Sequence, residues 1–237
     1  MPETTKYFCI DRTIPPEYAW LADQQAVQEN SANRSPFEAV STGKFWLLGR
    51  VLHVAFLEGT PELWERVEFY AKQWMRYANI TFLFDNRADA KIRITFQRGI
   101  GTWSYIGTDA LSISSDQPTM NYDSLTANSS DYAFSYYVLH EFGHALGLVH
   151  EHHSPKAGIQ WNKAAVKKDH PGFSDEYLET NIFKRYERSQ TQYSKFDPYS
   201  IMVYRIPKAW TLNGIETPEN AALSEIDKQY IQKWYPW

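Results

Sequence analysis

The chain of 237 residues contains a single cysteine, so no intramolecular disulfide can form. It has no long hydrophobic run: the most apolar stretch, residues 46–57, is short and includes Arg50 and His53, so no membrane-spanning helix is expected. Basic residues are not in excess, and a net charge of -4 argues against nucleic-acid binding. We therefore expect neither a nucleic acid nor a membrane as a partner.

Residues 1–6 also lack the apolar core of a secretory signal peptide. A cytosolic protein, export by a leaderless route and a trimmed chain all remain open. Aromatic residues, in contrast, are abundant at 16%, with nine tryptophans, and hydrophobic residues make up 43% of the chain. This composition and length fit one domain with a large core, with or without an appendage.

The spacing of apolar residues predicts strands mixed with helices in the first part of the chain. Thr60 and Asp131 are the expected N-caps of two long helices. After Gly147 the pattern becomes irregular, which favours an α+β fold. The predicted strands are residues 51–57, 81–84, 91–96 and an edge strand at 109–114, and the predicted helices are residues 17–30, 60–78, 131–146 and 224–234.

One segment, residues 140–150, carries a metal-binding pattern. His140 and His144 are four residues apart, so on a helix both imidazoles point the same way and can bind one Zn²⁺. Gly147 can end the helix and turn the chain, which brings His150 round as a third ligand. Three imidazoles leave a fourth position for water, as in catalytic zinc sites. Glu141 lies next to the first ligand, within reach of that water.

A chance match is the alternative to this interpretation. The motif H-E-x-x-H alone is short, but Gly147 and His150 at the right spacing lower the chance of a random match to about one in ten thousand. A purely structural helix is also disfavoured, because buried imidazoles need partners.

The pattern of residues 140–150, with a Met-turn candidate at residues 200–204, resembles the metzincin clan of zinc endopeptidases. The Ser-Ile-Met-Val-Tyr sequence of that turn and Glu151 are similar to astacins, whereas residues 145–148 are more like matrixins. Residues 223–227 are similar to segments before the last helix in both groups. The resemblance favours secretion.

The resemblance implies a metzincin-like fold, with a twisted mixed sheet, two long helices and an active-site cleft. Residues 44–237 would form the catalytic domain, with an upper subdomain at 44–150 and a smaller, irregular lower subdomain at 151–237. Zinc would lie at the floor of the cleft between them. Residues 1–43 would be a separate, prosegment-like segment.

The resemblance also implies roles for residues of the Met-turn. Tyr204 is expected to reach the zinc or to stabilise an oxyanion, although a buried packing role is the alternative. Met202 is expected to lie beneath the metal without binding it. His152 and His153 are not expected to be ligands, because His150 already has the required spacing.

Cys9 is a candidate zinc ligand of a latent state, because matrixin prosegments use a cysteine to displace the zinc-bound water and a thiolate binds zinc well. The alternative is a small apolar residue that packs against the domain. Trp103 and Tyr105 lie where the resemblance places the rim of the cleft. Packing is their more common role, and substrate contact is the alternative.

These residues together predict a zinc-dependent endopeptidase that acts on proteins or peptides. Glu141 would accept a proton from zinc-bound water as that water attacks the scissile carbonyl. Two other functions remain open: a catalytically silent, zinc-containing binding module and a zinc hydrolase of a non-peptide amide.

Overall fold

The computed structural model describes residues 9–10, 12–30, 43–186 and 195–237. The boundary of the predicted N-terminal segment, at residue 43, therefore adjoins residues outside the described part. Among the described residues, no helix combines the length and the apolar character needed to cross a bilayer.

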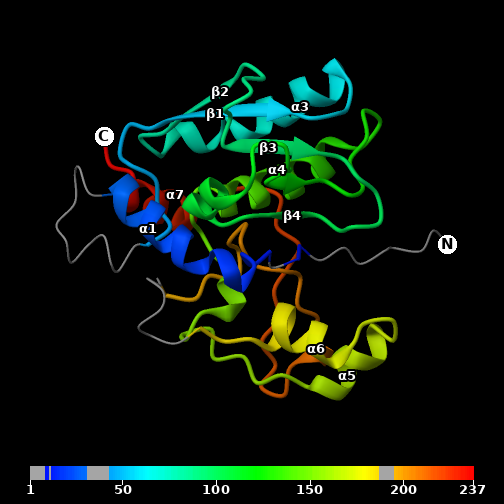
Figure 1. Ribbon diagram of the computed structural model, residues 1–237. Coiled ribbons are helices and arrows are strands. Elements are labelled where there is room, and N and C mark those ends of the chain that lie inside the picture. The colour runs from blue at the N-terminus through cyan, green and yellow to red at the C-terminus, as the bar shows by residue number, and fades with distance from the viewer. Residues whose placement is uncertain (1–8, 11, 31–42, 187–194) are drawn as a thin grey trace.

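A five-stranded mixed sheet forms the upper part of the molecule in Figure 1. Its strand order is β2-β1-β3-β5-β4; the first four strands are parallel, and β4 pairs antiparallel with β5 at the edge. All four residues of β3 are buried, as expected for an inner strand of a mainly parallel sheet. The strands are β1 (Val51–Phe56), β2 (Thr81–Phe84), β3 (Ile92–Thr95), β4 (Trp103–Ser104) and β5 (Met120–Asn121).

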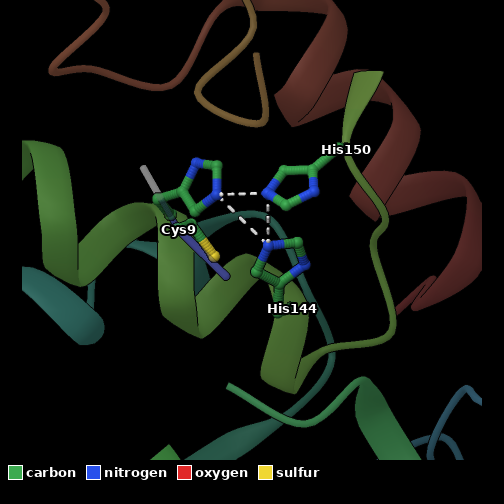
Figure 2. A group of neighbouring side chains, drawn as sticks. Cys9, His144 and His150 are labelled. Carbon is green, nitrogen blue, oxygen red and sulfur yellow. Dashed lines mark hydrogen bonds between the residues drawn. The ribbon is translucent and has the colours of Figure 1, made fainter. Parts of the chain in front are cut away.

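Two helices, α3 (Pro61–Ala71) and α4 (Asp131–Ala145), pack against each other beside the sheet. The Thr60 hydroxyl accepts a hydrogen bond from the Leu63 backbone N–H, which confirms the predicted cap of α3. Helix α4 is capped by Ser130 and not, as predicted, by Asp131, which lies in the first turn. The last turns of α4 present His144 to His150, which comes from the segment beyond the helix (Figure 2).

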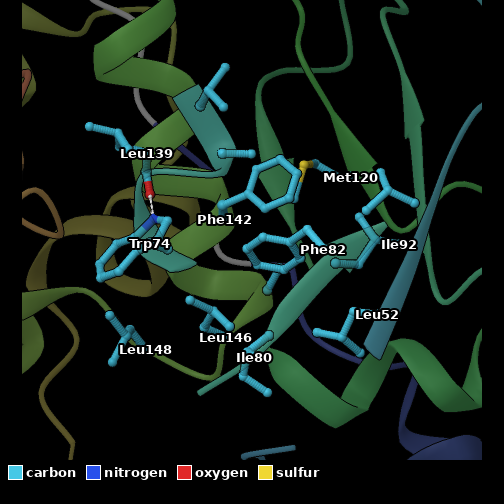
Figure 3. Packing of buried hydrophobic residues seen from close by; sticks show 14 of the residues in the cluster. Leu52, Trp74, Ile80, Phe82, Ile92, Met120, Leu139, Phe142, Leu146 and Leu148 are labelled. Atoms are coloured by element: carbon cyan, nitrogen blue, oxygen red, sulfur yellow. Dashed lines mark hydrogen bonds between the residues drawn. The ribbon is translucent and has the colours of Figure 1, made fainter. Parts of the chain in front are cut away.

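The main core lies between α4 and the sheet (Figure 3). Phe142 of α4 is fully buried and meets the ring of Phe82 edge to face, with the ring centroids 4.9 Å apart. Burying such a side chain contributes about 2–3 kcal/mol. The Trp74 indole N–H donates to the Leu139 carbonyl at 3.0 Å, so this large ring is both buried and satisfied. The core thus fixes α4, which carries the metal-binding pattern.

The predicted α+β fold and its mixed sheet are confirmed, but besides the cap of α4 two further local predictions were wrong. The expected edge strand at 109–114 is a 3-10 helix, η3 (Gly107–Ser112), and the edge strand beside β5 is β4. Gly107 has φ +49° and lies against the Lys44 carbonyl, and Lys44 pairs with Asp109, which coils this segment. The predicted helix 60–78 ends at Ala71, and a 3-10 turn, η2 (Trp74–Arg76), follows it.

The remaining elements are short. Helices α5 (Lys163–Asp169) and α6 (Asp175–Leu178) lie in the lower part of the molecule in Figure 1. A second hydrophobic cluster lies there, separate from the main core. Its fully buried members are Val166, Leu178, Ile182, Val203, Ile206 and Trp210. The other short elements are η1 (Pro16–Tyr18), η4 (Glu151–His153), the π-helix η5 (Glu179–Phe183) and η6 (Lys208–Trp210).

Two helices, one from the N-terminal part of the chain and one from its C-terminal part, pack onto the core. Helix α1 (Ala19–Asn30) confirms the predicted N-terminal helix and contacts η3. The Asn30 amide donates to the Phe45 carbonyl at 2.7 Å, so α1 is tied to the core domain. Helix α7 (Glu225–Trp234) is close to the predicted 224–234 and begins with a capping box made by Ser224 and Asp227.

Candidate metal centre

Three imidazole nitrogens converge at the end of α4. The Nε2 atoms of His140, His144 and His150 lie 3.1 to 3.2 Å from one another. Figure 2 shows the rings of His144 and His150 turned toward each other. The three rings are at most 3% exposed. The sequence spacing thus brings together the three side chains that it predicted as ligands.

The other ring nitrogen, Nδ1, of each of the two helical histidines lies against a backbone carbonyl oxygen. Nδ1 of His140 lies 2.7 Å from the Ile201 carbonyl oxygen, and Nδ1 of His144 lies 2.9 Å from that of Leu148. A carbonyl only accepts hydrogen bonds, so both Nδ1 atoms carry the proton and both Nε2 lone pairs face the centre. Burial, and after it the neighbouring His140 and His152 rings, lowers the pKa of His150 well below its usual range, which favours the neutral, metal-binding form.

The geometry of these nitrogens fits zinc. With Zn–N bonds of about 2.0–2.1 Å, tetrahedral coordination sets ligand nitrogens about 3.3–3.4 Å apart. The observed separations of 3.1 to 3.2 Å are close to that value. Lone pairs that face one another cannot hydrogen-bond to one another, whereas one cation can accept all of them.

The turn that delivers His150 depends on Gly147. Its φ is +98°, and an added Cβ would lie 3.0 Å from a ring carbon of Phe45 and 3.1 Å from the Lys44 carbonyl oxygen. Only glycine adopts such a backbone without strain.

We expect Gly147→Ala to lower the free energy of unfolding by about 1–3 kcal/mol, the usual cost of a strained backbone. Zinc affinity should fall as well, because His150 would be displaced. Denaturant unfolding and zinc titration measure the two effects. Gly172→Ala is the matched control, because nothing lies within 4 Å of its added Cβ. Equal effects in the two variants would contradict the role of Gly147.

The predicted Met-turn, residues 200–204, lies directly against α4 and its histidines. An added Cβ at Gly143 would overlap the Met202 sulfur, so this glycine within the motif lets Met202 approach α4. Sequence reasoning missed Gly143, although its place between the two helical histidines was a signal. Asp227 holds the turn, because its carboxylate accepts hydrogen bonds from the Ser200 hydroxyl at 2.7 Å and from the Ile201 N–H at 2.8 Å. Burial raises the pKa of Asp227, and these hydrogen bonds oppose that shift.

Cys9 lies at the same centre, although it is far from the histidines in sequence. One ligand atom from each of Cys9, His140, His144 and His150 lies within 4.8 Å of all the others. The Cys9 thiol is directed at the Glu141 carboxylate, with Sγ 3.5 Å from Oε2. Cys9 is buried, and Figure 2 shows its sulfur beside the imidazoles.

Tyr204 closes the site on another side. Its hydroxyl donates to the Cys9 backbone carbonyl and lies 3.4 Å from His150 Nδ1. Tyr204 is buried, and its hydroxyl points at the segment that contains Cys9.

The residues directly after His150 lie outside the ligand group found among the described residues. His152 and His153 are buried, and His152 Nε2 lies 3.4 Å from the Asn181 carbonyl oxygen. The Glu151 carboxylate accepts a hydrogen bond from the Asp197 N–H at 3.1 Å, while burial raises the pKa of Glu151 to about 7.

Comparison with known proteins decides the family. Residues 44–235 match the family model described as astacin, a peptidase family. The chain belongs to the astacin family. It is therefore a zinc metalloendopeptidase, a hydrolase that acts on proteins or peptides.

Solved structures agree with the astacin assignment. A structure of myroilysin is 43% identical with a TM-score of 0.80, and the match covers 84% of this chain and 98% of that chain. A crystal structure of myroilysin is 38% identical with a TM-score of 0.65, and the match covers 97% and 100% of the two chains.

A more distant structure shows the fold alone. It is high choriolytic enzyme 1, a hatching enzyme zinc-protease from the medaka fish Oryzias latipes. That chain is 17% identical with a TM-score of 0.58, and the match covers 82% of this chain and 96% of that one. No curated protein matches this astacin sequence.

Proposed function

We propose that this astacin holds one catalytic zinc through His140, His144 and His150, and that Glu141 is the general base of peptide hydrolysis. The observation that carries the proposal is the convergence of three buried Nε2 atoms beside a buried carboxylate. Zinc, when bound there, supplies a Lewis acid that lowers the pKa of water from 15.7 to about 7 and polarises a carbonyl.

Glu141 moves the proton in this proposal. Its Oε2 takes a proton from the attacking water and then delivers it to the nitrogen of the leaving amine. The contact between Cys9 Sγ and Glu141 Oε2, 3.5 Å apart, supports this role. Because Cys9 lies at the metal centre, this contact means that Oε2 faces the point where the ligand atoms converge.

Tyr204 donates a hydrogen bond to the oxyanion that forms as the scissile carbonyl is attacked. Its present partner, the Cys9 carbonyl oxygen, supports this role, since the phenol already donates to a peptide carbonyl beside the centre. Met202 shapes the apolar base of the site without binding zinc, and Gly143 makes its approach feasible.

We further propose that residues 1–43 are a prosegment and that Cys9 is the fourth zinc ligand of a latent enzyme. The start of the family match at residue 44 supports the boundary. The second hydrophobic cluster, drawn from residues between 166 and 210, supports a lower subdomain at 151–237 beside an upper one at 44–150. The cleft would lie between them.

The direct test of the proposed activity is digestion of casein by the zinc-loaded chain after its N-terminal segment has been removed. We expect digestion that 1,10-phenanthroline stops and that added zinc restores. A silent binding module would bind zinc without digesting casein. A hydrolase of non-peptide amides would leave a peptide library intact while it cleaves small amide substrates, and either result would overturn the proposal.

A further inference from the structure

The segment that contains Cys9 runs along the outer edge of the sheet. Cys9 forms a parallel bridge with Thr102, and the Ile10 N–H donates to the Thr102 carbonyl at 2.9 Å. Ile10 also packs onto Gly101, where an added Cβ would overlap its side chain. Because β4 is an edge strand, its outer side can pair with any extended peptide. The segment therefore occupies the position open to a substrate.

Arg12 continues this segment and meets two aromatic rings. Its guanidinium carbon lies 4.5 Å from the centre of the Trp103 ring and 5.9 Å from that of Tyr105. The two rings meet edge to face, with centroids 5.7 Å apart and planes at 78°. The rings are buried, at 2% and 6% exposure, while Arg12 itself is exposed. Two fixed rings thus form a cation-binding corner at the end of the edge strand.

We propose that Trp103 and Tyr105 form a substrate subsite for a basic side chain, which Arg12 fills in the latent chain. This inference rests on the proposed peptidase function and names its substrate class: peptides with arginine, and less strongly lysine, near the scissile bond. Arginine is favoured because its planar guanidinium both stacks on an aromatic face and carries the charge.

The register of the segment along β4 sets how many residues separate this subsite from the metal centre. Cys9 lies at the metal centre and Arg12 is three residues further along. A substrate that pairs with the same edge would have its scissile bond at the metal centre. The side chain two or three residues away from that bond would then lie over the two rings. A peptide that runs antiparallel to β4 would carry this residue before the scissile bond, and a parallel one would carry it after.

A pair of peptides tests the subsite without any change in the protein. The full-length chain is folded first, and its N-terminal segment is then removed through a specific protease site introduced between residues 36 and 42. Peptides carry arginine or citrulline, its neutral and nearly isosteric counterpart, at each position up to three residues on either side of the scissile bond. At one position two or three residues from that bond, we expect arginine to raise kcat/KM by about 3- to 30-fold, mainly through KM.

Variants then connect the preference to the rings. Tyr105→Leu should reduce the arginine preference, Tyr105→Phe should keep it, and Trp103→Leu should abolish it, provided that thermal unfolding shows a folded protein. Phe69→Leu, which removes an exposed ring on α3, is the control and should change nothing. In a Glu141→Gln background, calorimetry should show the same preference in Kd for uncleaved peptides.

The possible failures are distinguishable. If the peptides are cleaved but no position discriminates arginine from citrulline, the subsite is refuted while the proposed peptidase function stands. If discrimination persists unchanged in Tyr105→Leu and Trp103→Leu, the basic side chain binds elsewhere. If no peptide is cleaved, the proposed function itself fails.

Discussion

Glu141→Gln is expected to leave the zinc content unchanged and to lower kcat/KM for peptides by about 10²- to 10⁴-fold, the usual contribution of a general base. Glutamine has nearly the same shape but cannot take up the proton of the attacking water. The measurement combines elemental analysis with peptide hydrolysis, in protein that has been folded at full length and then freed of its N-terminal segment.

Glu65→Gln is the control for this experiment, because it makes the same chemical change on an exposed position of α3. It should keep full activity. Turnover at the wild-type rate in Glu141→Gln would remove Glu141 from its proposed role, whereas a parallel loss of zinc would show that the carboxylate helps to build the site instead.

Cys9→Ala in the full-length chain is expected to raise peptidase activity on the order of tenfold or more. The site is covered when the segment with Cys9 lies on it and open when the segment has left. A change of only 1.4 kcal/mol in the free-energy difference between these two states changes the ratio of their populations tenfold. Removing the thiol removes the fourth ligand atom at the centre, whereas the backbone contacts of residue 9 with Thr102 and with the Tyr204 hydroxyl can remain. Activity against one peptide, measured before and after removal of the segment, gives the ratio directly.

X-ray absorption at the zinc edge separates a zinc ligand from a packing residue at Cys9. The full-length chain should show one sulfur at about 2.3 Å and three nitrogens at about 2.0–2.1 Å. Cys9→Ser preserves the size of the side chain and should lose the sulfur signal along with the latency. Equal activity of Cys9→Ala and the untrimmed wild type would contradict the latch.

The helical part of the site could be predicted from sequence because the relevant spacing is local. His140 and His144 share one face of α4 by the period of the helix alone, and a glycine at the right place indicates the turn towards His150. The cap of α3 at Thr60 follows from an equally short pattern. Such signals need no knowledge of distant contacts.

The parts that could not be predicted depend on contacts between distant segments. Cys9 became a candidate ligand only through the resemblance to matrixin prosegments, because no spacing rule connects it with Glu141, 132 positions away. The edge strand was misplaced because β4 has only two residues, too few for an alternating pattern, whereas η3 is coiled by contacts with Lys44. Trp103 and Tyr105 were expected at the rim of the cleft, but their contact with Arg12 could not be predicted because it joins segments about 90 positions apart.

The central claim is that three buried imidazoles bind one zinc ion. Elemental analysis of the purified, folded full-length chain tests it most directly, with His144→Ala as the comparison. We predict about one zinc per chain in the wild type and much less in the variant after both are dialysed against a weak chelator. A wild-type chain that holds no transition metal, and takes up none on reconstitution, would contradict the account.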